Sequence, residues 1–362
     1  MESVKEIPQE VREAVEKVNE QNVQEFRLKN QYYQLLEQML PVLDKIIAYF
    51  SAGNSLSKET VQVLMKSVQE INKYLEGCIF RKNILPKNYE EVVKQLEQYG
   101  NEIWQKKMYE ILLEIKENMV LAMDTAKQER FTCCSCQQKN FFLPFTKYYE
   151  YMQKYYGATP WSYETQNDEH MVCPVCGSFD RERLIILALN KEELQEKRVL
   201  QFAPSVALDN YLKNREVGLY ESCDLFMDGV SFQADIQNMD MVSSQSYDIW
   251  ICSHVLEHVQ DDKKAMQELF RITKKGGYGL VLVPLDLEQK ETTEEWGRPS
   301  EECWRRFGQD DHTRKYAKQE FMERLENVGF EVEQLGKIAI GEEEFRENAL
   351  SDSSVLYKVK RK

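Results

Sequence analysis

Two pairs of cysteines have the spacing of a metal site. Cys133 and Cys136 form one C-x-x-C pair, and Cys173 and Cys176 form a second. Each short loop can place two sulfur atoms on one side of an ion, so the two pairs together could surround Zn²⁺ with four thiolates. A four-cysteine shell leaves no open coordination position, and we therefore predict a structural zinc site. Cys134 could replace Cys133 as a ligand, and the alternative is a set of buried, reduced thiols.

A second group of titratable residues lies in the segment 252–259, which reads C-S-H-V-L-E-H-V. On a helix, His254 and His258 would share a face with Glu257 between them, which makes a metal site there a less favoured alternative. A histidine used for packing or capping is another interpretation of His254. The stretch 307–316, F-G-Q-D-D-H-T-R-K-Y, combines an acid, a base and an anion-binding group, and a solvated loop is its alternative.

The elements around these residues alternate between strands and helices from about residue 195 onward. We expect strands at 198–203, 217–220, 247–252, 278–283, 330–340 and 354–359. A helix through 265–270 should end at the K-K-G-G sequence of 274–277, where basic residues and glycine are typical of a helix end. A second helix is expected over 318–327. This alternation predicts an α/β sandwich with right-handed crossovers.

The region before the cysteines differs in character. Residues 1–128 carry apolar positions at helical spacing, which predicts a helical bundle or coiled coil that serves packing and oligomerisation. We therefore expect three domains: this helical region, a four-cysteine zinc module at 129–194, and an α/β domain at 195–362. Homo-oligomers could form through the helical region.

Composition and charge restrict the classes of partner. The chain has 362 residues, with 47 Lys and Arg against 61 Asp and Glu, a net charge of −14. This acidity disfavours nucleic acid and anionic membranes, which need positive potential at the contact. No apolar run is long enough to span a bilayer, and the amino terminus has no signal-peptide pattern. Nine cysteines then favour a reducing compartment, and we predict a cytoplasmic location.

The order of motifs in residues 196–362 resembles the class I S-adenosylmethionine-dependent methyltransferases, in particular those with H-V-L-E-H after the fourth strand. A closer resemblance is to a bacterial, methyltransferase type 11-like subgroup that joins a cysteine-pair module to the methyltransferase. It is carried by V-L-Q-F-A-P at 199–204, C-P-V-C-G-S-F-D-R at 173–181 and the stretch 307–316. Members of this subgroup often appear beside surface-glycan enzymes. The resemblance implies a Rossmann-like fold, S-adenosylmethionine and methyl transfer.

The resemblance also implies where the cofactor should bind. A doubly wound sheet binds its ligand at the carboxyl ends of the strands, at the topological switch point. The family's glycine-rich turn after the first strand is replaced here by F-A-P. Asp224 is the preferred partner of the ribose, with Glu221 second. The expected cofactor-binding residues are Phe202, Ala203, Pro204, Asp224, Asp235, Ile236, Ser253 and His254.

Methyl transfer to a hydroxyl requires removal of a proton. His312 is the first candidate base, because the ordinary pKa of histidine is about 6.5, and Asp311 could orient it. Glu257 or His258 is the alternative. We expect a small-molecule or glycan-type acceptor, with O-directed transfer as one option, in bacterial surface polysaccharide metabolism. The alternative function is a non-catalytic adaptor or sensor that has a degenerate methyltransferase fold and oligomerises through its helices.

Overall fold

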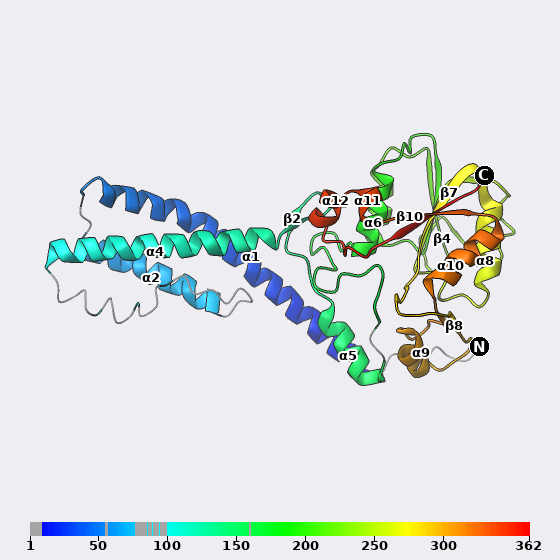
Figure 1. Ribbon diagram of the computed structural model, residues 1–362, viewed down its shortest axis with the longest axis horizontal. Coiled ribbons are helices and arrows are strands. Elements are labelled where there is room, and N and C mark those ends of the chain that lie inside the picture. The colour runs from blue at the N-terminus through cyan, green and yellow to red at the C-terminus, as the bar shows by residue number, and fades with distance from the viewer. Residues whose placement is uncertain are drawn as a thin grey trace. The chain divides into compact units, whose positions relative to one another are not determined.

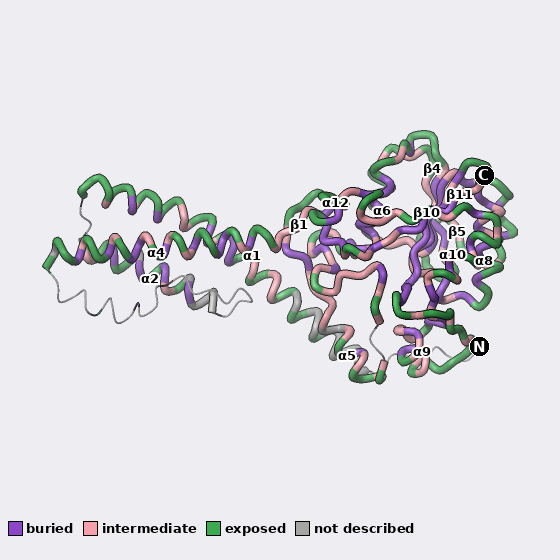
Figure 2. The backbone as a smooth tube through the Cα atoms, viewed as in Figure 1, coloured by how far each residue is buried: buried purple, intermediate pink, exposed green. Residues whose placement is uncertain are grey.

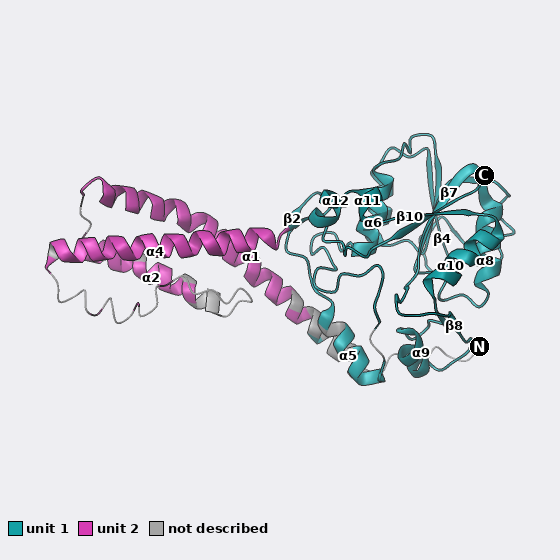
Figure 3. Cartoon of the chain, in the orientation of Figure 1, with its two compact units in different colours: residues 1–18, 131–362 teal, residues 19–130 magenta. Residues whose placement is uncertain are grey.

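The computed structural model describes residues 9–54, 57–76, 85, 89, 94, 100–158 and 161–362. It divides the chain into two compact units, residues 19–130 and residues 131–362 with 1–18, which Figure 3 shows in different colours. The helical pattern predicted for 1–8 and for most of 77–99 lies outside the described residues. In the part of the chain that is described, no helix is long and apolar enough to cross a membrane.

The unit of residues 19–130 is helical, which confirms the predicted class of this region. Its described helices are α1 (Gln9–Ser51, which begins before the unit), α2 (Lys58–Glu76) and α4 (Asn101–Gln128) (Figure 1). Three polar pairs show that α1 and α4 run side by side and antiparallel: Lys29 with Glu129 at 3.3 Å, Asp44 with Lys116 at 2.5 Å, and Ser51 with Tyr109 at 3.0 Å. Apolar side chains between the helices are buried, among them Leu36, Leu43, Val68, Leu112, Ile115 and Met119. A coiled coil and an oligomer remain predictions.

The second unit is built on a seven-stranded sheet with the order β5-β4-β3-β6-β7-β11-β10. The first five strands in this order are parallel, and β11 is antiparallel to both β7 and β10. This arrangement confirms the predicted Rossmann-like α/β fold with a final antiparallel pair. The bounds are β3 (Arg198–Phe202), β4 (Leu219–Asp224), β5 (Phe232–Gln233), β6 (Tyr247–Ser253), β7 (Thr273–Leu282), β10 (Glu331–Leu335) and β11 (Leu356–Lys360).

Helices cover both faces of this sheet, as Figure 1 shows with the sheet nearly edge-on. One face packs against α8 (Asp262–Ile272) and α10 (Lys318–Val328). The other face packs against α6 (Asp180–Leu189), α7 (Val206–Lys213), α11 (Lys337–Ile340) and α12 (Glu342–Glu347). Successive residues of β6 alternate between the two cores, and the buried layer follows the strands in Figure 2. Because α6 packs on the sheet, the predicted zinc module contributes directly to the core of the α/β fold.

Two local predictions were wrong. The helix before β7 ends at Ile272, because the Thr273 hydroxyl donates to the Leu269 carbonyl at 2.6 Å and Thr273 then pairs with β6. The K-K-G-G sequence therefore lies inside β7 rather than at a helix end, with Gly276 at φ +73°. The strand expected at 330–340 ends at Leu335, and α11 follows.

Shorter elements surround the sheet and the cysteine pairs. They are β1 (Phe131–Thr132), β2 (Lys139–Asn140), α5 (Thr146–Tyr156), β8 (Thr293–Glu294), α9 (Ser300–Phe307) and β9 (Arg314–Lys315). The hairpin β1–β2 encloses the first cysteine pair, and α9 leads into the polar stretch 307–316. These segments therefore position two of the groups singled out from the sequence.

Candidate functional site

The topological switch point of the sheet lies between β3 and β6. These strands are parallel neighbours, but the chain leaves β3 toward β4 and returns to β6 only later. Ala203 and His254 directly follow the two strands, and both have left-handed backbone conformations, with φ of +44° and +55°. Such a conformation costs a residue other than glycine about 1–2 kcal/mol, and strain of this kind gathers at functional sites. Ala203 therefore adopts a backbone conformation that ordinarily favours glycine.

Asp224 and Glu221, the two candidate ribose partners, occupy different positions on β4. Asp224 is the last residue of β4, and its Oδ1 accepts hydrogen bonds from the amides of Phe226 and Met227 at 2.7 and 2.8 Å. Glu221 lies earlier in the strand and accepts from the Tyr247 hydroxyl at 3.0 Å. Asp224 thus lies at the carboxyl end of its strand, and its role as the ribose partner stays a prediction.

The other predicted cofactor residues also gather at this carboxyl edge. Asp235 follows β5, and its Oδ1 accepts from the Gln237 amide at 2.8 Å, while Ile236 is buried. Pro204 is half-buried beside the buried Phe202. Ser253, the last residue of β6, has a buried hydroxyl with no hydrogen-bond partner. This hydroxyl and the half-buried strand ends fit a polar ligand such as a nucleoside, and the individual roles remain predictions.

Beside the switch point, three of the four histidines of the chain surround one buried carboxylate. Glu257 is 0% exposed, and its Oε1 lies 3.2 Å from His254 Nδ1, 3.9 Å from His258 Nε2 and 3.9 Å from His312 Nε2. We call these four residues the histidine–carboxylate cluster. Burial alone would raise the pKa of Glu257, but the neighbouring histidines lower it to about 2. The residues 254–260 form turns and not a helix, so a turn brings His254 and His258 together.

Two of the histidines have different electrostatic surroundings. Asp311 Oδ2 lies 3.1 Å from His258 Nδ1. Although burial lowers the pKa of His258, Asp311 and Glu257 raise it overall. His312 Nδ1 lies 3.0 Å from the Phe307 carbonyl, and burial lowers the pKa of His312 to about 4. Asp311 therefore pairs with His258 and not with His312, contrary to the predicted pairing, and His312 is uncharged at neutral pH.

A cavity of about 280 Å³ opens beside the cluster. His254, His258 and His312 line it, together with residues 283–285 that follow β7. Its other lining residues include Tyr163 and Arg181, from the predicted zinc module, and Trp304, from α9. The buried Trp304 Nε1 has no hydrogen-bond partner. Tyr163 and Arg181 were not predicted as site residues. Both lie far along the chain from the strand ends, and no sequence motif connects them to those strands.

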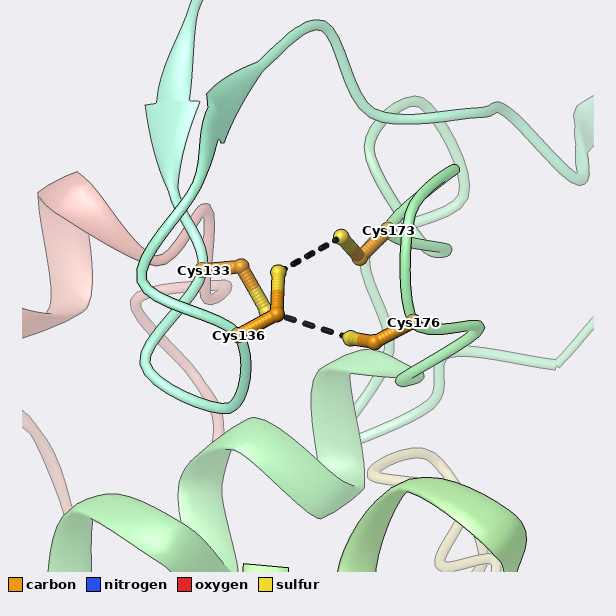
Figure 4. A group of neighbouring side chains, drawn as sticks. All are labelled: Cys133, Cys136, Cys173 and Cys176. Carbon is orange, nitrogen blue, oxygen red and sulfur yellow. Dashed lines mark hydrogen bonds between the residues drawn. The ribbon is translucent and has the colours of Figure 1, made fainter. Parts of the chain in front are cut away.

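The two cysteine pairs come together in the same unit, as Figure 4 shows. The sulfur atoms of Cys133 and Cys176 are 3.6 Å apart, and those of Cys136 and Cys173 are 3.8 Å apart. All four lie within 4.8 Å of one another. Tetrahedral zinc with Zn–S bonds of about 2.3 Å requires sulfur atoms about 3.8 Å apart. The four thiols therefore fit a structural zinc ion.

Both cysteine loops have the same local geometry. The Gln137 amide donates to the Cys133 carbonyl at 2.7 Å, and the Gly177 amide donates to the Cys173 carbonyl at 2.9 Å. The Cys133 amide also donates to the Gln138 carbonyl at 3.0 Å, and the Cys173 amide donates to the Ser178 carbonyl at 2.9 Å. Gln137 and Gly177 both have positive φ, +59° and +72°. Each loop is therefore shaped by its own backbone hydrogen bonds.

Cys134 lies outside this group of four. Its sulfur faces the Arg183 carbonyl at 3.5 Å, in the core under the sheet, and burial raises the pKa of its thiol. Arg183 is fully buried and donates to the carbonyls of Met171 and Ser178, each at 2.9 Å, and of Asn348 at 2.8 Å. Arg183 thus ties the second cysteine loop to the carboxyl-terminal part of the chain. Between the two candidates, the geometry favours Cys133 as the ligand.

Comparisons with known proteins give one family model and several similar solved structures. Residues 172–335 match the family model described as a methyltransferase domain. Similar solved structures include the YcgJ protein of Bacillus subtilis (15% identity, 49% of this chain, 98% of that chain, TM-score 0.33). Another is an S-adenosylmethionine-dependent methyltransferase of Mesorhizobium loti (14% identity, 49% of this chain, 96% of that chain, TM-score 0.34). A third is the SpnF cyclase (11% identity, 60% of this chain, 95% of that chain, TM-score 0.37). A comparison with curated proteins gives no match.

The family match and the strand order concern the same part of the chain. The matched range begins at the second cysteine loop and includes α6, the parallel strands and β10. It thus contains the switch point, the histidine–carboxylate cluster and most of the cavity lining. Residues 172–335 are accordingly similar to a methyltransferase domain, and they contain the parallel strands of the Rossmann-like sheet.

Proposed function

We propose that this chain transfers the methyl group of S-adenosylmethionine to a hydroxyl of a small, polar, glycan-type acceptor. The observation that carries the proposal is the cavity beside the switch point, because His254 belongs both to the predicted cofactor site and to the cavity lining. Asp224 would hold the ribose, Asp235 and Ile236 the adenine, and Ser253 and His254 the methionine end. Arg181, Gln166 and the histidines offer partners to a hydroxyl-rich acceptor.

The chemistry requires alignment and removal of a proton. S-adenosylmethionine supplies a methyl group that is already electrophilic. The acceptor oxygen forms a bond to the methyl carbon while the carbon–sulfur bond breaks, and the electron pair of that bond stays on sulfur. The hydroxyl proton passes to the histidine–carboxylate cluster, in which His312, Glu257 and the pair of His258 with Asp311 are the candidate acceptors. Zinc at the cysteine group would hold the wall of the cavity in place.

The cellular setting is part of the same proposal. The resemblance to a subgroup found beside surface-glycan enzymes supports a role in surface polysaccharide metabolism, with cytoplasmic modification of an intermediate. The helical unit would bring several copies together.

Calorimetric titration of the full chain with S-adenosylmethionine tests the cofactor site. We expect Asp235→Asn to weaken binding about tenfold or more, since a hydrogen bond to a charged group contributes about 1.5–3 kcal/mol. Asp228→Asn, at an exposed carboxylate of the same region, is the matched control and should bind normally. Absence of binding to the unaltered chain would overturn the proposal.

Transfer of a labelled methyl group to monosaccharides and nucleotide sugars tests the reaction itself. His312→Ala should lower turnover strongly and leave cofactor affinity nearly unchanged. Cofactor binding without transfer to any of these acceptors would instead favour the sensor alternative.

A further inference from the structure

We propose that the histidine–carboxylate cluster is a second metal site, separate from the cysteine group, which binds a divalent transition metal through Glu257, His258 and His312. These residues come from the turn after β6 and from the stretch that follows α9. His254 lies beside this group, with its Nδ1 3.2 Å from the same carboxylate oxygen.

The spacing of the ligand atoms fits a single ion. One ligand atom from each of the three residues lies within 4.8 Å of the others. The carboxylate oxygen is 3.9 Å from each of the two Nε2 atoms. A tetrahedral ion with bonds of about 2.0–2.1 Å holds its ligand atoms about 3.4 Å apart. Closure by about half an ångström would bring both oxygen–nitrogen pairs to this spacing.

The two histidine rings are already oriented as metal ligands. His258 Nδ1 faces Asp311 Oδ2 at 3.1 Å, and His312 Nδ1 faces the Phe307 carbonyl at 3.0 Å. Each acceptor holds the ring proton on Nδ1, so the lone pair of Nε2 points toward Glu257. Histidines that bind metals commonly donate their other ring N–H to a carboxylate or a backbone carbonyl. The two rings stand edge to face, with centroids 4.6 Å apart.

The buried carboxylate faces ring nitrogens. Glu257 is fully buried, and its Oε1 lies 3.2 Å from His254 Nδ1 and 3.9 Å from the Nε2 atoms of His258 and His312. Burial of an ionised carboxylate costs several kcal/mol unless opposite charge compensates for it. A divalent cation bound to this oxygen would supply that charge.

The donor set indicates which metals the site would bind and whether a coordination position stays open to the cavity. Two imidazoles and a carboxylate suit zinc, iron, cobalt or manganese better than the thiol-seeking metals. Three protein ligands leave a coordination position open, as in catalytic zinc sites, and His258 and His312 line the cavity. If the proposed function holds, this position would receive the acceptor oxygen and favour loss of its proton.

Titration with Co²⁺ tests the site without reference to activity. The full chain, dialysed against a weak chelator so that zinc stays at the cysteine group, should take up about one Co²⁺. Nitrogen and oxygen ligands give visible ligand-field absorption without the sulfur charge-transfer bands of a cobalt thiolate. Glu257→Gln and the double variant His258→Ala/His312→Ala should each lose this absorption. His170→Ala removes the one histidine outside the cluster and should keep it.

The outcomes separate the site from the proposed function. Absent Co²⁺ uptake, or uptake that is equal in the cluster variants, would overturn the metal site. Calorimetry with S-adenosylmethionine on the same variants should give unchanged affinity, which shows that they are folded. Specific Co²⁺ uptake without methyl transfer to any acceptor would leave the metal site standing and overturn the proposed function.

Discussion

The cysteine group and the histidine–carboxylate cluster are two candidate metal sites assembled in different ways. The cysteine group takes its four ligands from two short loops of the same geometry, each closed by its own backbone hydrogen bonds. The cluster takes its ligands from a turn after β6 and from residue 312, which is distant in the sequence. The first group has a closed set of four thiols, whereas the second has three ligands beside a cavity. Local assembly thus accompanies the proposed structural site, and long-range assembly accompanies the proposed open site.

The cluster depends on contacts that the cysteine group does not need. The Thr313 amide and hydroxyl both donate to the Glu257 carbonyl, at 2.9 and 3.0 Å. The Arg314 guanidinium donates to the carbonyls of Val259 at 2.6 Å and Gln260 at 3.0 Å, and also to that of Leu256. These bonds hold the segment that carries His312 against the turn that carries Glu257.

The largest expected effect comes from breaking the cysteine group. Cys173→Ser should abolish zinc binding there and destabilise the unit of residues 131–362 by more than the ~1–3 kcal/mol of ordinary substitutions, since binding of structural zinc contributes on the order of 10 kcal/mol in zinc fingers. Metal analysis and thermal unfolding of the full chain measure both quantities. Cys134→Ser, at the neighbouring thiol outside the group, should keep the zinc. Retention of zinc in Cys173→Ser would contradict the assignment of the four cysteines as a structural zinc site.

An intermediate effect is expected at the support of the cluster. Arg314→Met should cost about 3 kcal/mol of unfolding free energy, because it leaves buried carbonyls without donors. It should also weaken Co²⁺ binding at the cluster and leave zinc at the cysteine group. Arg305→Met, at an exposed arginine of α9, should change neither. Equal loss of both metals in Arg314→Met would show that the two sites are not independent.

The smallest expected effect distinguishes the two cysteine loops. Gly177→Ala should cost about 1–2 kcal/mol for the left-handed conformation alone, because a Cβ there would meet nothing within 4 Å. Gln137→Gly, at the same position of the other loop, should stabilise the chain by less than about 1 kcal/mol, since the freer unfolded chain offsets part of the gain. Denaturant unfolding with zinc bound measures both changes. An unchanged stability of Gly177→Ala would mean that the loop relaxes to another conformation.

The sequence predicted the features that depend on local patterns. The C-x-x-C spacing predicted four thiols that the structure brings together, and the alternation of strand-like and helix-like segments predicted an α/β sandwich. Local patterns failed where pairing between strands overrides them. The K-K-G-G sequence belongs to β7 because Thr273 pairs with β6 directly after the helix ends. The partner of Asp311 was also predicted incorrectly, since adjacency to His312 in the chain gave no information on which ring Asp311 faces.

The sequence by itself thus determined the spacing of the cysteines in their loops and the succession of strands and helices along the α/β part of the chain. Both follow from short-range periodicity and turn chemistry. Only the tertiary structure decided which side chains surround Glu257, how Arg181 and Tyr163 reach the cavity, and which cysteine of the adjacent pair faces the other loop. Those relations depend on how distant segments fold against one sheet, and that folding is set by the packing of the whole unit rather than by any single motif.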